Sequence, residues 1–183
     1  MLANLRLLFG RLIDIALLRA GPETLPASPG VLAFAILLNA TVSVLMVVLV
    51  PGVPAFAPLE LIVSIVVPLL WFQVAFVLER KRERFLQTMT ALFGVNALFM
   101  PFVTPVLVAM LPYMEKPDPS TPPPAVMSLL LLMLGIWQLI ALVRIVRAAF
   151  EWNYVAVVIF VLAQNFATLV IVGALFGVPA GKA

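Results

Sequence analysis

Five long apolar segments alternate along this chain with short basic clusters, and this alternation is what most limits how the chain can fold. The clusters are Arg6/Arg11/Arg19, Arg80/Lys81/Arg82/Arg84 and Arg144/Arg147. If each apolar segment crosses a bilayer once, all three clusters face one side, and only Lys116 and Lys182 face the other. Because cytoplasmic loops carry an excess of Lys and Arg, the pattern predicts a cytoplasmic N-terminus. After five crossings, the C-terminus is expected on the periplasmic or extracellular side.

The composition indicates the same class of protein. Of the 183 residues, 64% are hydrophobic and only 10% are charged, whereas a soluble domain carries roughly a quarter charged residues. We therefore expect an all-α, multi-pass protein of a plasma or inner membrane. The net charge of +3 does not indicate nucleic acid as a partner, because the basic residues flank apolar segments.

Helix lengths follow from the thickness of the bilayer, since one span needs about 20 residues. The transmembrane domain is expected over residues 31–177, with spans at about 31–50, 59–78, 85–111, 126–146 and 154–176. A linker at 21–30 precedes it and a short tail at 178–183 follows it. Pro68 predicts a kink in the second span, and Pro101 and Pro105 break the second half of the third, where we expect a tilted or kinked helix.

Residues 1–20 have the pattern of an amphipathic helix. One face at helical spacing carries Leu5, Leu8, Phe9, Leu12, Ile15 and Ala16. The segment is too charged to span a membrane, so we expect it to lie in the cytoplasmic interface with its arginines near lipid phosphates. A short helix packed on the bundle is an equally good interpretation of the same pattern.

Each span places an uncharged polar side chain near its middle. The candidate polar layer consists of Asn39, Gln73, Asn96, Gln138, Gln164 and Asn165. Because an amide in hydrocarbon needs a partner, these groups should face inward and hydrogen-bond between helices. The alternative is a binding pocket or a narrow polar path. No charged residue lies near a predicted span centre, which disfavours a proton-coupled carrier.

Two tryptophans, Trp71 and Trp137, fall deeper than the interfacial aromatic belt. Since each indole N–H requires an acceptor, we expect both to face the bundle. The basic turn with Arg80, Lys81, Arg82 and Arg84 is a candidate contact for anionic lipid or a partner, although such clusters more often only set topology.

Catalytic chemistry has no evident basis in the sequence. The chain has no cysteine and no histidine, which excludes thiol chemistry, Cys/His metal sites and the common histidine-based acid–base pairs. Neither a phosphate-binding loop nor a dinucleotide fingerprint is present. We therefore expect no enzyme activity, no cofactor and no resident metal.

The order of elements resembles that of the YIP (Ypt-interacting protein) family and its small bacterial relatives. The run Thr88-Met89-Thr90-Ala91-Leu92-Phe93-Gly94, followed by Pro101, is similar to the third span of that family. The run Ile136-Trp137-Gln138-Leu139-Ile140 through Arg144, with the apolar span after it, is similar to its fourth and fifth. The resemblance covers about residues 30–177. It implies the five-span fold and a place in the bacterial inner (plasma) membrane. For the bacterial relatives it implies little about activity, so no functional residue is carried over.

These observations favour a non-enzymatic adaptor, scaffold or accessory subunit that acts through helix–helix and lipid contacts. Its partners would be membrane lipid, other membrane proteins or a second copy of itself. A small transporter or channel for a neutral or lipidic solute, lined by the central amides, is the first alternative. A subunit of a larger membrane complex is the second.

Overall fold

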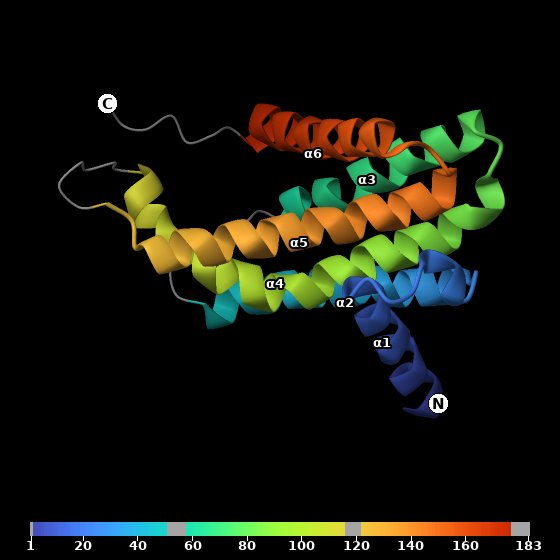
Figure 1. Cartoon of the computed structure of the whole chain (residues 1–183), viewed down its shortest axis with the longest axis horizontal. Helices are drawn as coiled ribbons and strands as arrows, with labels where there is room; N and C mark the ends of the chain where they lie inside the picture. Colours follow the sequence, from blue (N-terminus) through green and yellow to red (C-terminus); the bar gives the residue numbers. More distant parts are fainter. Residues whose placement is uncertain (1, 51–57, 116–121, 177–183) are drawn as a thin grey trace.

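The computed structural model describes residues 2–50, 58–115 and 122–176, and these form helices and no strand. Figure 1 shows a long helical bundle with one short helix projecting from its side. In chain order the elements are α1 (Leu2–Ala16), η1 (Pro22–Thr24), α2 (Pro29–Leu49), α3 (Pro58–Leu78), η2 (Arg82–Arg84), α4 (Phe85–Glu115), α5 (Ala125–Phe150) and α6 (Tyr154–Phe176).

Five of the helices in the described residues, α2 to α6, are long and apolar enough to cross a membrane. The prediction of an all-α chain with five helices of membrane-spanning length is therefore confirmed. Two of these helices, α4 and α5, run about four residues past the predicted ends of their spans. Helix α4 continues through Pro101, Pro105 and Pro112 to Glu115, and α5 continues past the predicted end at Val146 to Phe150. Arg144 and Arg147 do not end α5, because a helix can extend beyond the hydrocarbon into water.

Helix α4 occupies the centre of one layer, where it packs between α2 and α5. Helices α3 and α6 pair in a second layer, which joins the first through contacts of α6 with α5 and of α3 with α4. The face of α2 that packs on α4 can be seen in its sequence. Its buried residues Leu32, Ala35, Asn39 and Ser43 recur every three or four positions and so share one face.

Helix α1 packs on the first layer through the face that its sequence pattern indicates. Leu8, Leu12 and Ile15 are buried in a cluster with residues of α4 and α5, whereas Leu7 and Ile13 are exposed. Gly94 of α4 allows this close approach, because a Cβ at that position would lie 2.6 Å from Cδ2 of Leu12. The described helix thus docks on the bundle, as the second interpretation of the pattern holds, and its placement in a lipid interface stays a prediction.

An aromatic cluster lies where α3, α5 and α6 meet, near the end of the bundle that carries the basic turns. We use the name for Phe72, Phe76, Phe150, Trp152 and Phe160. Phe76 and Phe150 stack with ring centroids 4.4 Å apart, and Phe150 stacks on Trp152 at 4.7 Å. Phe72, Phe76 and Phe150 are almost completely buried. The cluster fills the space between the two layers at this end.

Candidate functional site

Three of the predicted amides form a hydrogen-bonded chain that crosses the first layer. Asn96 of α4 donates from Nδ2 to Oδ1 of Asn39 on α2 at 2.9 Å, and it accepts at Oδ1 from Nε2 of Gln138 on α5 at 3.0 Å. One turn along α2, the Ser43 hydroxyl donates to the backbone carbonyl of Asn39 at 2.8 Å and lies 3.4 Å from the sulfur of Met100. Asn96 is therefore the link that joins three helices.

A cavity of about 410 Å³ lies beside this chain of amides, between the two layers. Its lining comes from α2, α3, α4, α5 and α6 and includes no charged side chain. The polar residues that line it are Asn39, Ser43, Ser64, Asn96, Gln164, Asn165 and Thr168. A cavity of this size is within the range of small-molecule sites, about 300–1,000 Å³. Its chemistry suits an uncharged ligand that forms hydrogen bonds.

The two predicted amides of α6 face this cavity and bond within their own helix. Gln164 Nε2 donates to Thr168 Oγ1 at 3.1 Å, and Asn165 Nδ2 donates to the carbonyl of Val161 at 2.8 Å. A side-chain amide has two N–H donors and one carbonyl oxygen. Each of these bonds uses one donor, so each side chain retains hydrogen-bonding capacity toward the cavity.

Gln73 differs from the prediction, because it is exposed on the outside of α3 and does not line the cavity. Its neighbour Phe72 points into the bundle. Successive residues of a helix are turned by about 100°, which carries Gln73 away from the interior. Thus the structure brings Asn39, Asn96, Gln138, Gln164 and Asn165 to the region between the helices, and leaves Gln73 outside it.

The two predicted tryptophans lie in different environments, Trp71 inside the bundle and Trp137 on its outer face. Trp71 packs against Phe160 with ring centroids 5.7 Å apart, and its buried Nε1 has no acceptor among the described residues. Trp137 is 45% exposed, so the expectation that it faces the bundle is wrong. Its Nε1 instead donates to the carbonyl of Ala16, at the end of α1, at 2.8 Å. This bond gives the indole N–H an acceptor even though Trp137 lies on the outer face of α5.

In comparisons with protein-family models, with curated proteins and with solved structures, no match was found. The resemblance to the YIP family stays a prediction.

The basic turn between α3 and α4 caps the end of α5. The last four carbonyls of a helix lack partners within it, and in α5 these belong to residues 147–150. The carbonyl of Arg147 accepts from the backbone N–H of Glu151 at 2.7 Å. The carbonyls of Ala148 and Ala149 each accept from Nη1 of Arg84 at 3.2 Å, and that of Phe150 accepts from Nζ of Lys81 at 2.8 Å. The two cations also lie at the negative end of the α5 dipole, which is a favourable position.

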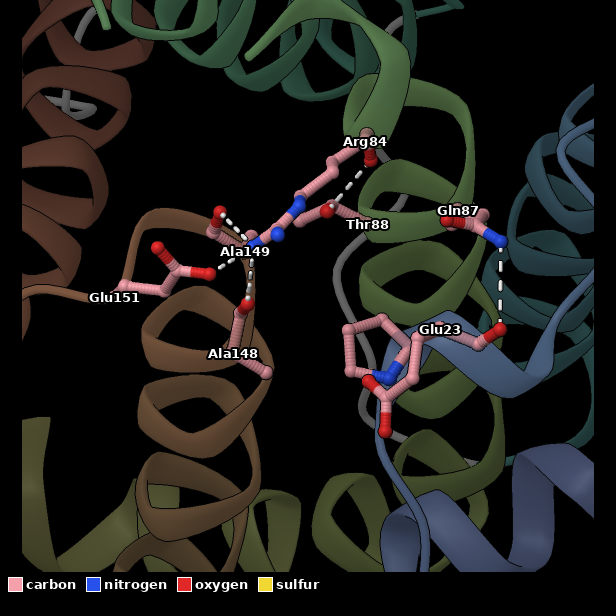
Figure 2. A pocket seen from close by; sticks show the side chains of 8 residues that line it. Glu23, Arg84, Gln87, Thr88, Ala148, Ala149 and Glu151 are labelled. Atoms are coloured by element: carbon pink, nitrogen blue, oxygen red, sulfur yellow. Dashed lines mark hydrogen bonds and ion pairs between the residues drawn. The ribbon is translucent and has the colours of Figure 1, made fainter.

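Glu151 completes this cap. Its carboxylate accepts from Lys81 Nζ at 2.9 Å and from Arg84 Nη1 at 2.7 Å. The hydrogen bonds from Lys81 and Arg84, together with their positive charges, hold the pKa of the Glu151 carboxyl below its ordinary value. Figure 2 shows Arg84, the last residue of η2, reaching to Glu151 and to the end of α5.

The cap borders a hollow of about 350 Å³ between α4, α5 and the linker before α2. On the linker side, Gln87 of α4 donates to the carbonyl of Leu25 at 2.7 Å. Its Nε2 also lies 3.4 Å from the carbonyl of Glu23 (Figure 2). These bonds fasten the linker to the same end of the bundle.

The candidate lipid or partner contacts therefore have two different environments. Lys81 and Arg84 are engaged within the chain, while Arg80 and Arg82 are exposed on the turn. Glu151 was not singled out in the sequence, although an acid directly after a predicted span, on the side of an isolated basic turn, is a usable signal. Among the residues that the structure describes, no group of three His, Cys, Asp or Glu side chains could hold a metal.

Proposed function

We propose that this chain is a non-enzymatic membrane protein that binds a neutral, hydrogen-bonding solute in the amide-lined cavity and moves it across part of the bilayer. The observation that carries the proposal is the cavity of about 410 Å³, whose lining has seven polar side chains and none that is charged. Its amides keep N–H or carbonyl groups beyond the bonds that they form within the protein. Because such groups are costly in hydrocarbon without a partner, a polar solute in the cavity would satisfy them.

The bonds of the lining residues support a neutral ligand. Asn39 and Asn96 are fixed by their mutual hydrogen bond, so they present their remaining N–H groups in defined positions. Gln164 and Asn165 sit across the cavity from them, on α6. An ion would require a compensating charge, which this lining does not supply. A solute with hydroxyl or amide groups would instead exchange its water partners for these side chains.

The two ends of the cavity differ. Phe72 lines it and belongs to the aromatic cluster, which separates it from the basic end of the bundle. In the other direction, the lining of the cavity continues through Ser43, Ser64 and Met100, which lie farther from the basic end of the bundle. We infer that the cavity opens toward the face opposite the basic clusters. Passage of a solute through the whole bundle would then require the aromatic cluster to move.

The proposed location is the bacterial inner membrane, with the N-terminus cytoplasmic and the C-terminus on the opposite side. The support is the segregation of charge: the turns that carry Lys81, Arg84 and Glu151 meet at one end of the bundle, where Arg144 also lies on α5. Reporter fusions to each terminus test this orientation.

The function itself is tested by flux in proteoliposomes, with glycerol and urea as neutral probes and potassium as a charged one. We expect the wild-type protein to raise the permeability of at least one neutral probe above that of empty liposomes, with no effect on potassium. Asn96→Leu and Asn165→Leu should reduce the increase, and Gln73→Leu should not, because Gln73 lies outside the cavity. Equal neutral flux in wild-type and empty liposomes would count against transport.

A second candidate, an adaptor or accessory subunit, has one observation in its favour. Gln73 is an amide exposed on the outer face of an apolar helix, and such side chains commonly hydrogen-bond between helices. A partner in the membrane, or a second copy, would satisfy it. Gentle-detergent copurification from native membranes should then recover a stoichiometric partner with the wild-type chain, and less of it with Gln73→Leu.

A further inference from the structure

The outer face of α5 carries a stripe of residues that is apolar at one end and basic at the other. We call the six residues at three- and four-residue spacing, Met133, Ile136, Trp137, Ile140, Arg144 and Arg147, the α5 stripe. All six are exposed, and this spacing places them on one side of the helix. The stripe is distinct from the amide-lined cavity, with which it shares no residue.

Two adjoining hollows follow the stripe. Its four apolar residues and Leu18 line a hollow of about 260 Å³. Beyond Ile140, Arg144 and Arg147 line a second hollow of about 330 Å³, together with Ala148 and Glu151. The surface thus offers an apolar groove that leads directly to a pair of guanidinium groups.

The end of α1 and the turn after it lie beside the groove, and their backbone carbonyls hold its polar side chains in place. Trp137 Nε1 donates to the carbonyl of Ala16 at 2.8 Å, and Arg144 Nη1 donates to that of Leu18 at 2.6 Å. Arg147 donates to the Tyr154 hydroxyl at 2.9 Å, and its guanidinium lies 4.1 Å from the centre of that ring. Because a guanidinium has five N–H donors, each arginine keeps others with which to bind an anion.

The charge around the second hollow is positive. Glu151 lies in it, but Lys81 and Arg84 already pair with this carboxylate. Counting the lining residues Arg144 and Arg147 and the paired Lys81 and Arg84 against Glu151 gives four positive charges and one negative, a local net charge of +3. A second copy docked through the same face would bring like charges together, which disfavours that occupant. An anion is favoured.

The length of the stripe identifies what kind of anion fits. From Met133 to Arg144 is eleven residues, or about 16 Å along a helix at 1.5 Å per residue. This is about half of a hydrocarbon core of about 30 Å, which is one leaflet. In addition, the uncharged part of α5 from Ala125 ends at Val143, which puts Arg144 at the membrane boundary. Basic pockets at this depth bind the headgroups of anionic lipids.

We propose that the α5 stripe binds one anionic phospholipid of the leaflet on the basic side. The phosphate lies against Arg144 and Arg147, and an acyl chain follows Ile140, Trp137, Ile136 and Met133. The site also joins the α1 end of the chain to α5, since Leu18 lines the groove and the carbonyl of Ala16 accepts from Trp137.

Trp137 lies in the groove and reports on the lipid beside it. The protein is reconstituted in phosphatidylcholine vesicles that contain a small, fixed fraction of brominated lipid, which quenches tryptophan on contact. The brominated lipid is either phosphatidylglycerol or phosphatidylcholine. The difference in quenching between wild type and Trp137→Phe isolates the contribution of Trp137 from those of Trp71 and Trp152.

We expect brominated phosphatidylglycerol to occupy the site about 30-fold more strongly than brominated phosphatidylcholine, since each arginine contributes about fivefold. Arg144→Gln/Arg147→Gln should abolish the preference. The matched control Arg80→Gln/Arg82→Gln removes the same charge from exposed positions on the same side and should keep it. Arg144→Lys/Arg147→Lys retains the charge and should keep part of the preference for phosphatidylglycerol. This variant separates loss of binding from loss of fold.

Three results would overturn the proposal. The first is equal quenching of Trp137 by the two brominated lipids in the wild-type protein. The second is a preference that survives in Arg144→Gln/Arg147→Gln, which would place the anionic lipid elsewhere. The third is loss of the preference when inorganic phosphate is added at millimolar concentration, which would identify a free anion as the ligand.

Discussion

Replacing Asn96 by leucine should weaken the bundle more than any other single amide substitution in the described residues, because Asn96 is the one amide among them that bonds to two other helices. Leucine has nearly the same size but removes both the donor to Asn39 and the acceptor for Gln138, which are held at 2.9 and 3.0 Å. A side-chain hydrogen bond in a membrane protein contributes about 0.6 kcal/mol on average and up to about 1.7. Two such bonds give an expected loss of roughly 1–3 kcal/mol.

Two other leucine substitutions calibrate this value. Gln138→Leu removes only one bond and should cost about 0.6–1.7 kcal/mol. Gln73→Leu changes the same chemical group at an exposed position, and should change stability by less than about 0.5 kcal/mol. The order of the three losses is therefore predicted, as well as their size.

Equilibrium unfolding in mixed micelles of rising dodecyl sulfate content, followed by circular dichroism, measures these differences. A double-mutant cycle makes the test sharper. In the Asn96→Leu background, Gln138→Leu should cost almost nothing further, because its bond is already gone. If Asn96→Leu costs no more than Gln138→Leu, and the two losses add, the hydrogen-bonded chain across α2, α4 and α5 is refuted.

Other predictions concern the cap of α5 and the docking of α1. Because the pKa of Glu151 is lowered, its contribution to stability is complete above the ordinary glutamate pKa of 4.5 and is lost as pH falls through the lowered value. Unfolding of wild type and Glu151→Gln from pH 7 to pH 3 should show this acid-dependent step in the wild type only. Arg84→Gln should cost about 1 kcal/mol in the same unfolding assay at neutral pH, since it leaves two carbonyls of α5 without a partner, whereas Arg82→Gln, on an exposed residue, should not. Gly94→Ile should displace α1, because even a Cβ there meets Leu12 at 2.6 Å, and limited proteolysis in the linker 21–28 should become faster; Gly135→Ile, where a Cβ meets nothing within 4 Å, should not change it.

The spans were predictable because hydrocarbon thickness fixes a length that the sequence displays directly. The docking face of α1 was predictable for a related reason. In a segment with charges, the apolar positions Leu8, Leu12 and Ile15 stand out at helical spacing, and these became the buried face. What the pattern did not contain is the partner surface. Nothing in the sequence relates Leu12 to Gly94, since the two meet only through the packing of α1 on α4.

The polar site was predictable in kind and not in arrangement. An amide in an apolar span has to find a partner, which pointed to Asn39, Asn96 and Gln138. In α3, however, nearly every position is apolar, so the sequence has no periodicity that distinguishes the inner face. For that reason Gln73 was placed inside, although it lies outside. The cap on α5 was missed because Lys81 and Glu151 are 70 residues apart, and only the pairing of helix ends brings them together.

Cysteine accessibility tests the central proposal most directly, because the natural chain contains no cysteine. Single cysteines replace Ser43 and Ser64, which line the cavity, and Leu132, which is exposed on the outer face of α5. A membrane-impermeant thiol reagent is then added to either side of sealed vesicles of known orientation. We predict that Ser43→Cys and Ser64→Cys react from the side opposite the basic clusters and not from the basic side, while Leu132→Cys is protected by lipid from both. If the two cavity positions are as unreactive as Leu132→Cys from both sides, the cavity is not open to solutes and the proposed function is wrong.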